Sequence, residues 1–309
     1  MAREKGRHVV FCVPALDLID QTLASFWQDG IGDVGVIQAD HIETDWSRPV
    51  QIASVQTLTR RGYPPADLVI IDEAHRCFEF YERWMADPVW QTVPFIGLSA
   101  TPWTKGLGKH FDDLIIAATT AEMIEAGHLS KFRVFAPDHP DLRGVKNVAG
   151  DYHEGQLSEV MNKAVLTANI VETWLQKGED RPTLCFAVDR AHAKALQQQF
   201  EAAGVPTGYQ DAHTSKEERA EIRRKFHRGE IKVVCNVGTL TTGVDWDVRC
   251  IVFARPTRSE ILYVQIVGRG LRTTEGKDDC LILDHSDTAL RLGFVTDIHH
   301  DKLDDGRPR

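Results

Sequence analysis

Short apolar runs alternate with longer stretches of helical periodicity through the first part of the chain. The stretch after residue 13 has apolar side chains at Leu16, Ile19 and Leu23, a spacing that places them on one face of a helix. The apolar runs do not alternate with polar residues, which is typical of strands buried on both faces of a parallel sheet. These runs lie at residues 9–13, 50–53, 68–71 and 95–98. The pattern predicts a parallel α/β domain.

The same alternation starts again after Gly127, with a different sequence. Apolar runs that predict strands lie at residues 132–135, 183–188, 233–237, 251–254 and 281–284, and amphipathic stretches that predict helices lie at residues 157–175, 191–200 and 216–227. Because the two series share an architecture but no repeated sequence, we expect two parallel-sheet domains in tandem and exclude a solenoid. Gly127, Pro137 and Pro140 punctuate the boundary. The expected domains are residues 1–129 and 130–292, followed by a polar tail at 293–309 that frays.

The composition is that of an ordinary soluble protein. The chain has 309 residues, of which 42% are hydrophobic and 26% charged, a balance that favours folding over disorder. No apolar stretch approaches the roughly 18–20 residues of a membrane span, and the charged start MAREKGR is unlike a secretory signal. We therefore expect a cytoplasmic protein without a membrane partner. Its six cysteines form no Cys-x₂-Cys pair, so a zinc site is not indicated.

The net charge of −9 argues against a protein that wraps nucleic acid by bulk electrostatic attraction. The charge is unevenly distributed, because residues 1–129 hold 10 Lys and Arg against 18 Asp and Glu, which leaves most basic residues in the second half. A nucleic-acid groove in this protein would therefore be local.

Two adjacent carboxylates directly follow the apolar run at residues 68–71. Asp72 and Glu73 are thereby delivered to the carboxyl end of a parallel strand, where open α/β sheets bind their ligands. Neighbouring side chains on an extended segment diverge, so one carboxylate can hold Mg²⁺ through its water shell while the other orients or deprotonates an attacking water. The alternative is a solvated strand end, but the Ala74 and His75 that follow favour the functional interpretation.

Two further groups of polar residues occur in the second half. Arg269 and Arg272 are three residues apart, so on a helix they share a face and can reach one phosphate group, which a guanidinium binds through two hydrogen bonds. A solvated arginine pair on a helix surface is the alternative. Thr239 and Thr242 lead into a small-residue loop at 243–245, where glycine permits close backbone approach and threonine can bond phosphate. A plain strand-to-helix turn is the alternative there.

These residues resemble the motifs of superfamily 2 helicases and translocases. Asp72-Glu73-Ala74-His75 resembles the DEAH box of that family. Residues 13–21 resemble motif Ia, 53–57 motif Ic, 98–102 motif III, 183–188 motif IV, 238–245 motif V and 265–272 motif VI. One four-residue box is moderate evidence, whereas ordered motifs over nearly the whole chain are strong evidence. The resemblance is to the branch of restriction-endonuclease motors and excision-repair helicases, and it implies two RecA-like domains in tandem.

The resemblance implies an ATP-dependent DNA helicase or translocase that uses ATP and Mg²⁺, with Mg²⁺ held by Asp72 through water. The residues it implies for catalysis are Glu73, Gln265, Arg269 and Arg272, the arginines acting as fingers across the domain cleft. Those implied for nucleotide binding are Asp72, His75, Gly243 and Asp245, and those implied for coupling ATP state to domain movement are Ser99 and Thr101. Those implied for nucleic-acid contact are Pro14, Gln21, Ser54, Gln56, Thr239 and Thr242, with DNA favoured over RNA.

The phosphate-binding loop of such motors, a glycine-rich segment ending in Gly-Lys-Ser/Thr, does not occur in these 309 residues. Gly108-Lys109 is followed by His110, and Gly276-Lys277 is followed by Asp278. The family would place the loop upstream of residue 9. We therefore expect the first domain to be incomplete at its N-terminus, with an unpaired apolar edge near residues 95–98 that favours association.

Three functions are compatible with these observations. The leading interpretation is a helicase or translocase core that is inactive as this isolated chain. A second is a non-hydrolysing nucleic-acid-binding or regulatory fragment. A third is half of a motor that a separate chain, carrying the phosphate loop, completes.

Overall fold

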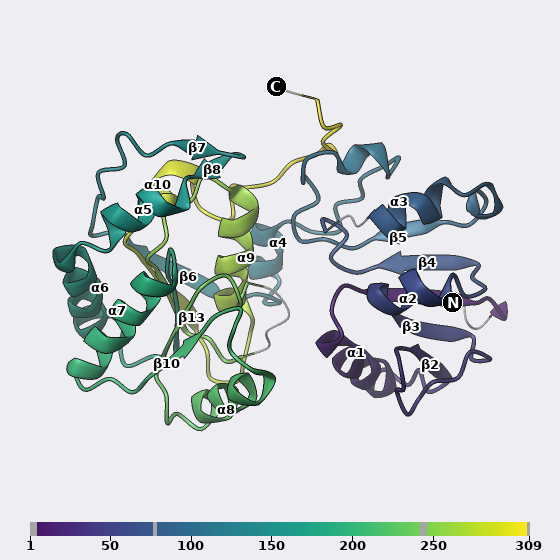
Figure 1. Ribbon diagram of the computed structural model, residues 1–309, viewed down its shortest axis with the longest axis horizontal. Coiled ribbons are helices and arrows are strands. Elements are labelled where there is room, and N and C mark those ends of the chain that lie inside the picture. Colours follow the sequence, from purple (N-terminus) through teal and green to yellow (C-terminus); the bar gives the residue numbers. More distant parts are fainter. Residues whose placement is uncertain (1–4, 77–78, 242–245, 308–309) are drawn as a thin grey trace. The chain divides into compact units, whose positions relative to one another are not determined.

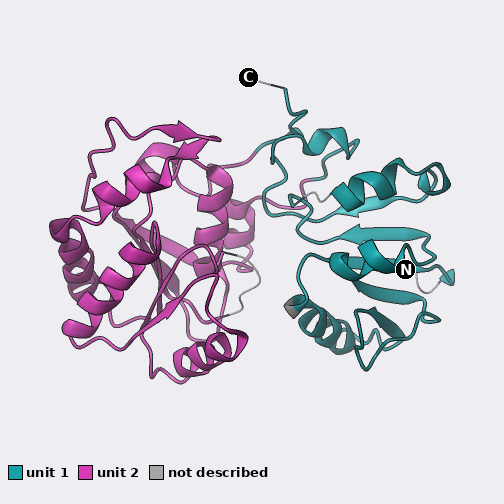
Figure 2. Ribbon diagram, in the orientation of Figure 1, with its two compact units in different colours: residues 1–115, 300–309 teal, residues 116–299 magenta. Residues whose placement is uncertain are grey.

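The computed structural model describes residues 5–76, 79–241 and 246–307 (Figure 1). The chain forms two compact units, of which the first comprises residues 1–115 and 300–309 and the second residues 116–299 (Figure 2). The chain therefore leaves the first unit, forms the whole of the second and then returns.

The first unit is built on a five-stranded parallel sheet with the strand order β2-β3-β1-β4-β5. Its strands are β1 (Val9–Val13), β2 (Val34–Ile37), β3 (Val50–Ser54), β4 (Leu68–Ile71) and β5 (Phe95–Gly97). Its helices are α1 (Asp17–Gln28), α2 (Val55–Arg61) and α3 (Glu79–Ala86). The sequence predicted four of these strands and missed β2, because Gly35 interrupts its short apolar run.

Helices cover both faces of this sheet. Successive residues of a strand point to opposite faces, so Val10 and Cys12 of β1 pack in the core under α2 and α3, whereas Val13 packs in the core under α1. Trp84 of α3 is fully buried and stacks on Tyr63, with ring centroids 4.6 Å apart. Both faces are thus occupied by packing, which leaves the carboxyl ends of the strands for chemistry.

The second unit holds a six-stranded parallel sheet with the order β10-β11-β9-β12-β13-β6 and a small antiparallel hairpin, β7-β8. Its strands are β6 (Lys131–Phe135), β7 (Asn147–Val148), β8 (Asp151–Tyr152), β9 (Thr183–Phe186), β10 (Thr207–Gln210), β11 (Val233–Asn236), β12 (Cys250–Phe253) and β13 (Asp279–Asp284). Its helices are α4 (Thr120–Glu125), α5 (Glu154–Met161), α6 (Ala164–Lys177), α7 (Arg190–Ala202), α8 (Lys216–His227), α9 (Glu260–Leu271) and α10 (Thr288–Leu292). The prediction of two parallel α/β domains in tandem is confirmed.

The single helix predicted over residues 157–175 is in fact two helices, α5 and α6. Asn162 ends α5, and its side-chain amide donates a hydrogen bond to the Ser158 hydroxyl at 2.8 Å. Lys163 has an extended backbone, with ψ of 130°, and starts α6. Apolar spacing did not reveal this break, because both helices bury apolar side chains such as Met161 and Ile170.

The boundary between the units lies at residues 115 and 116 instead of 129 and 130. The connecting segment belongs to the second unit because its backbone is bonded there. The Ser130 N–H donates to the Leu271 carbonyl at 2.7 Å, and Leu129 forms an antiparallel bridge with Arg272.

The tail after residue 293 is anchored where fraying was expected. Val295 and Ile298 are buried in the second unit. Asp304 then joins the first unit, where its carboxylate accepts a hydrogen bond from the Gly106 N–H at 3.1 Å and its carbonyl accepts one from the Gly108 N–H at 2.8 Å. A polar sequence gives no sign of such backbone contacts.

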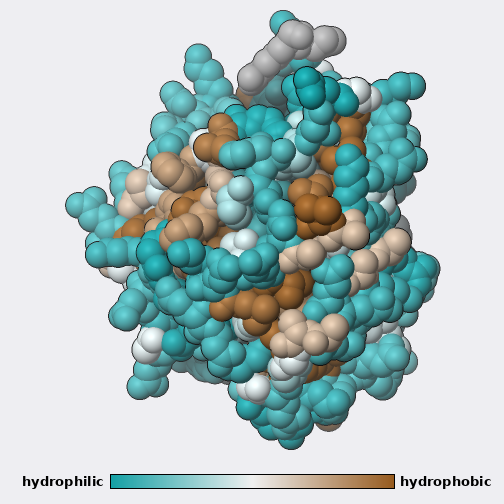
Figure 3. Space-filling view, turned by 90° about the vertical axis from the view of Figure 1, so that its left-hand side faces the viewer, coloured by the Kyte–Doolittle hydropathy of each residue, from teal (hydrophilic) through white to brown (hydrophobic). Residues whose placement is uncertain are grey.

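Polar side chains cover most of the face shown in Figure 3, with apolar patches among them. Isolated exposed apolar residues such as Val165 and Leu175 of α6 are ordinary on protein surfaces. Among the residues that the structure describes, no helix has the length and apolar character needed to cross a bilayer.

Candidate functional site

Residues 72–75, here called the acid box, directly follow β4 and are held by backbone hydrogen bonds to the chain segments on either side. The Asp72 N–H donates to the Cys12 carbonyl of β1 at 2.9 Å, and the Ala74 N–H donates to the Leu98 carbonyl, which follows β5, at 2.9 Å. This places Asp72 at the carboxyl edge of the parallel sheet, as the sequence predicted and as ligand binding in such sheets requires.

Glu73 adopts a left-handed backbone conformation, with φ of 51°. Such a conformation is uncommon for a residue with a bulky side chain and clusters at functional sites. The turn is held by the Glu73 N–H, which donates to Asp72 Oδ1 at 3.0 Å. The Glu73 carboxylate lies 3.3 Å from His75 Nδ1, and the Ser99 hydroxyl lies 3.3 Å from the same nitrogen. The structure therefore brings together four of the predicted site residues, Asp72, Glu73, His75 and Ser99.

The electrostatics of the cluster favour a bound cation. Burial, reinforced by the neighbouring charge of Glu73, raises the pKa of the Asp72 carboxyl above its ordinary value. A hard cation such as Mg²⁺ prefers carboxylate oxygens and would offset this charge repulsion. Burial and the Arg76 charge lower the pKa of His75, which keeps the imidazole neutral near pH 7. The residues present therefore fit Mg²⁺ at Asp72, and its attachment through water stays a prediction.

The second half of the cluster comes from the segment after β5. The Thr101 N–H donates to the Ser99 hydroxyl at 3.0 Å, so the two predicted coupling residues are joined. Thr101 is fully buried, and its hydroxyl has no hydrogen-bond partner among the described residues. Gly97 allows this segment to pass close to the acid box, because a side chain there would overlap Ala74 and Phe111.

The predicted nucleic-acid residues of the first unit lie on two neighbouring segments. The Gln56 side chain donates to the Pro14 carbonyl at 3.0 Å, which ties α2 to the end of β1. Ser54 is buried and caps α2 by accepting the Thr57 N–H at 3.2 Å, so its hydroxyl is engaged within the fold. Gln21 is exposed on α1. Contact of these residues with nucleic acid remains a prediction.

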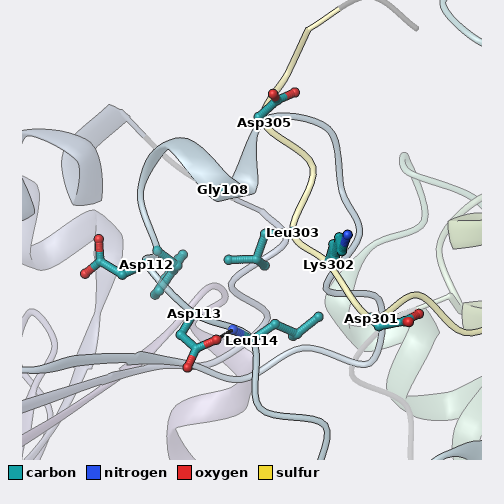
Figure 4. A pocket seen from close by; sticks show the side chains of 9 residues that line it. Gly108, Asp112, Asp113, Leu114, Asp301, Lys302, Leu303 and Asp305 are labelled. Atoms are coloured by element: carbon teal, nitrogen blue, oxygen red, sulfur yellow. Dashed lines mark hydrogen bonds between the residues drawn. The ribbon is translucent and has the colours of Figure 1, made fainter.

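Two hollows lie within the first unit. One, of about 400 Å³, lies beside His75 and is lined by the lysines and histidine of residues 104–110. The other, of about 310 Å³, lies between residues 108–114 and residues 301–305 (Figure 4). Its four aspartates point away from one another in Figure 4, so they do not converge on a cation. Among the described residues no group of three or more acidic, histidine or cysteine side chains has the arrangement of a metal site.

In the second unit, the arginine pair lies at the end of α9. Gln265 and Arg269 are half-buried residues of the helix itself. Arg269 lies in the last turn of α9, and Arg272 is the residue that caps the helix end, with a helical φ of −60° and an extended ψ of 136°. That the two guanidiniums share a face and reach one phosphate group stays a prediction, and the chain turns away from the helix after Arg272.

The predicted loop after β11 is described only in part. Thr239 accepts a hydrogen bond from the Gln210 side chain at 3.3 Å. Thr242, Gly243 and Asp245 lie outside the described residues, so their predicted roles stay predictions.

One residue that sequence analysis passed over lies next to the arginines. Lys277 was considered only as part of a Gly-Lys pair that fails the phosphate-loop pattern, yet its ammonium contacts three backbone carbonyls beside Arg272. No sequence motif indicates this role, because Lys277 bonds backbone carbonyls, which every residue has.

Comparisons with protein families agree with this arrangement unit by unit. The family described as Type III restriction enzyme, res subunit, matches residues 1–104, and the family described as Helicase conserved C-terminal domain matches residues 163–274. The acid box lies within the first match and the arginine pair within the second. Two parallel α/β units with these motifs in this order define a helicase-type protein. The chain belongs to the superfamily 2 helicase-like family.

Individual relatives extend the comparison. The chain is 34% identical over 252 residues to IRC3 of Saccharomyces cerevisiae, named as an ATP-dependent helicase; the match covers 76% of this chain and 37% of IRC3. A fragment of an HsdR subunit of a type I restriction enzyme from Vibrio vulnificus YJ016 matches 98% of this chain and 56% of that chain, with a TM-score of 0.69 and 21% identity. Dbp5 of S. cerevisiae, bound to RNA, matches 94% and 75%, with a TM-score of 0.58 and 13% identity. The two structures confirm the tandem RecA-like fold, and the chain spans little more than a third of IRC3.

Proposed function

We propose that this chain is the core of an ATP-dependent motor that moves on or unwinds nucleic acid. The observation that carries the proposal is the cluster of Asp72, Glu73, His75 and Ser99 at the carboxyl edge of a parallel sheet. A metal-binding carboxylate beside a second carboxylate that is poised on a neutral histidine suits phosphoryl transfer to water.

In this proposal each group has a separate task. Asp72 holds Mg²⁺, which neutralises charge on the nucleotide phosphates when it is bound. Glu73 accepts a proton from the attacking water, and His75 and Ser99 keep its carboxylate in place. Gln265, Arg269 and Arg272 of the second unit contact the terminal phosphate, where arginine stabilises charge that develops in the transition state. His75, Gly243 and Asp245 complete the nucleotide contacts, and Thr101 joins Ser99 in relaying the ATP state.

Nucleic acid is the proposed partner, contacted by Pro14, Gln21, Ser54, Gln56, Thr239 and Thr242. Loop amides and helix ends bind phosphate without much net positive charge, which suits a chain with a net charge of −9. The matches to restriction-enzyme proteins support DNA over RNA. We further propose that the protein works in the cytoplasm.

We also propose that these 309 residues do not hydrolyse ATP on their own. Phosphoryl transfer depends mainly on positioning, and the sequence offers no lysine and amide cradle to hold the triphosphate. The edge of the first sheet supports a motor completed by a separate chain. Strand β5 pairs with β4 alone among the described strands, and Ile96 within β5 and Leu98 directly after it are 47% and 43% exposed. An added strand carrying a phosphate loop would cover this apolar edge.

Hydrolysis of Mg²⁺-ATP, measured with and without DNA or RNA, tests the proposal. We expect no appreciable turnover from the 309-residue chain, and DNA-stimulated turnover once a phosphate-loop segment is joined to it or supplied as a second chain. Turnover by the 309 residues alone that Asp72→Ala abolishes would refute the need for that segment. A completed version that binds DNA but never hydrolyses ATP would favour the non-hydrolysing nucleic-acid-binding alternative.

A further inference from the structure

Lys277, in the turn between α9 and β13, makes an unusual set of contacts for a lysine. Its ammonium donates hydrogen bonds to the carbonyl oxygens of Val248 at 2.8 Å, Gly270 at 2.5 Å and Arg272 at 2.7 Å. An ammonium has three donors and no acceptor, so these three carbonyls use its full capacity. Burial lowers the pKa of Lys277, and the three carbonyl dipoles replace the water that the charge has lost.

These contacts hold the end of the arginine helix. The last carbonyls of a helix lack partners within it, and a cation there is favoured by the helix dipole. At the end of α9 three consecutive carbonyls are each bonded from outside the helix. Those of Gly270 and Arg272 accept from Lys277, and the one between them, at Leu271, accepts the Ser130 N–H at 2.7 Å.

The surrounding packing leaves this segment little freedom to shift. A side chain at Gly270 would overlap Cys280 of β13 and Ile251 of β12, so the helix lies directly on the sheet. Lys277 also bonds Val248, which leads into β12, and thereby ties the helix end to the same two strands. The backbone of Arg272 is thus fixed to the sheet on one side and to the connecting segment at Leu129 and Ser130 on the other.

We propose that Lys277 is a positioning residue for Arg272, holding the backbone from which that guanidinium reaches toward phosphate. The inference rests on the proposed function for the role of Arg272 itself. Because a misplacement of about 1 Å costs a catalytic group much of its effect, a fixed backbone matters more here than on an ordinary surface loop.

NMR spectroscopy of the 309-residue chain tests the inference without requiring ATP hydrolysis. In Lys277→Met, which keeps the side-chain length and removes the donors, we expect the guanidinium N–H signal of Arg272 to shift or broaden. We also expect hydrogen exchange of the Ser130 N–H to become about tenfold faster, because the Leu271 carbonyl that accepts its hydrogen bond is no longer held in place. The guanidinium signal of Arg219, bonded to the carbonyls of Thr214 and Asp211, serves as an internal reference that is expected to stay unchanged.

Matched variants separate positioning from general damage. Lys225→Met removes an exposed lysine of α8 and is expected to change none of these signals. Lys277→Arg keeps donors at the site and is expected to restore part of the Arg272 signal. If Lys277→Met does not fold, Lys277→Gln, which retains two donors, is measured in the same way.

Two results are decisive, and they address different statements. The inference would be overturned if Lys277→Met or Lys277→Gln had the same Arg272 signal and the same Ser130 exchange rate as the unaltered chain. A completed motor whose ATP turnover is insensitive to Arg272→Ala would overturn the proposed role of Arg272 and leave the contacts of Lys277 untouched.

Discussion

Glu73 has a more constrained conformation than its neighbours in the site, since it combines a left-handed backbone with a carboxylate 3.3 Å from His75 Nδ1. We expect Glu73→Gln, in a version completed with a phosphate loop, to lower ATP turnover by about 10²–10⁴-fold while nucleotide binding stays nearly intact. The amide keeps the shape of the side chain but cannot accept the proton. Single-turnover hydrolysis and a nucleotide titration check this, with the exposed Glu172→Gln as the control. Unchanged turnover would remove Glu73 from catalysis.

At the same scale, the positions of Asp72 and Arg272 differ in how far the sequence could predict them. Asp72 directly follows a run of four apolar residues, and the topology of a parallel sheet alone puts such a residue at the carboxyl edge. Arg272 depends on Ser130 and Lys277, which act through backbone carbonyls, and no side-chain pattern encodes such contacts. The sequence therefore predicted where Asp72 lies, whereas it gave no sign of the contacts that hold the backbone of Arg272.

The junction between β9 and α7 contains a buried histidine that makes the second unit sensitive to acid. His192 is fully buried, and its Nδ1 accepts the Val188 N–H at 3.3 Å, which requires the neutral imidazole. Burial lowers its pKa to about 4. Between about pH 6.5 and 4 the unfolded chain therefore takes up a proton that the folded chain refuses, so stability falls as the pH decreases through this range.

Because of His192, we expect the free energy of unfolding of the second unit to be about 2 kcal/mol lower at pH 5 than at pH 7. His192→Asn offers an oxygen acceptor in place of Nδ1 and should show a much smaller difference, although it is less stable at pH 7. Urea unfolding at the two pH values measures this, with the exposed His128→Asn as control. An equal pH dependence in His192→Asn would rule out this residue as the cause.

At the scale of the whole molecule, the first unit consists of two separate stretches of chain, residues 1–115 and 300–309, which Asp304 links. Its carboxylate accepts the Gly106 N–H at 3.1 Å and the Gly306 N–H at 2.7 Å. We expect Asp304→Ala to destabilise the first unit by about 1–2 kcal/mol and to leave the second unit unchanged, since two hydrogen bonds to a charged group are lost. Urea unfolding followed separately at Trp84 and Trp174, one in each unit, measures both. A shift of the same size in the exposed Asp305→Ala would show that the tail contributes no specific contact.

This discontinuity also has a consequence for folding during synthesis on the ribosome. Domains usually fold in the order of their synthesis, the N-terminal one first. Here residues 116–299 emerge complete before the stretch at 300–309 that Asp304 fastens to the loop at Gly106 and Gly108. We therefore expect the second unit to acquire its native contacts before the first unit, which needs residues 300–309 to complete the contacts at Gly106 and Gly108.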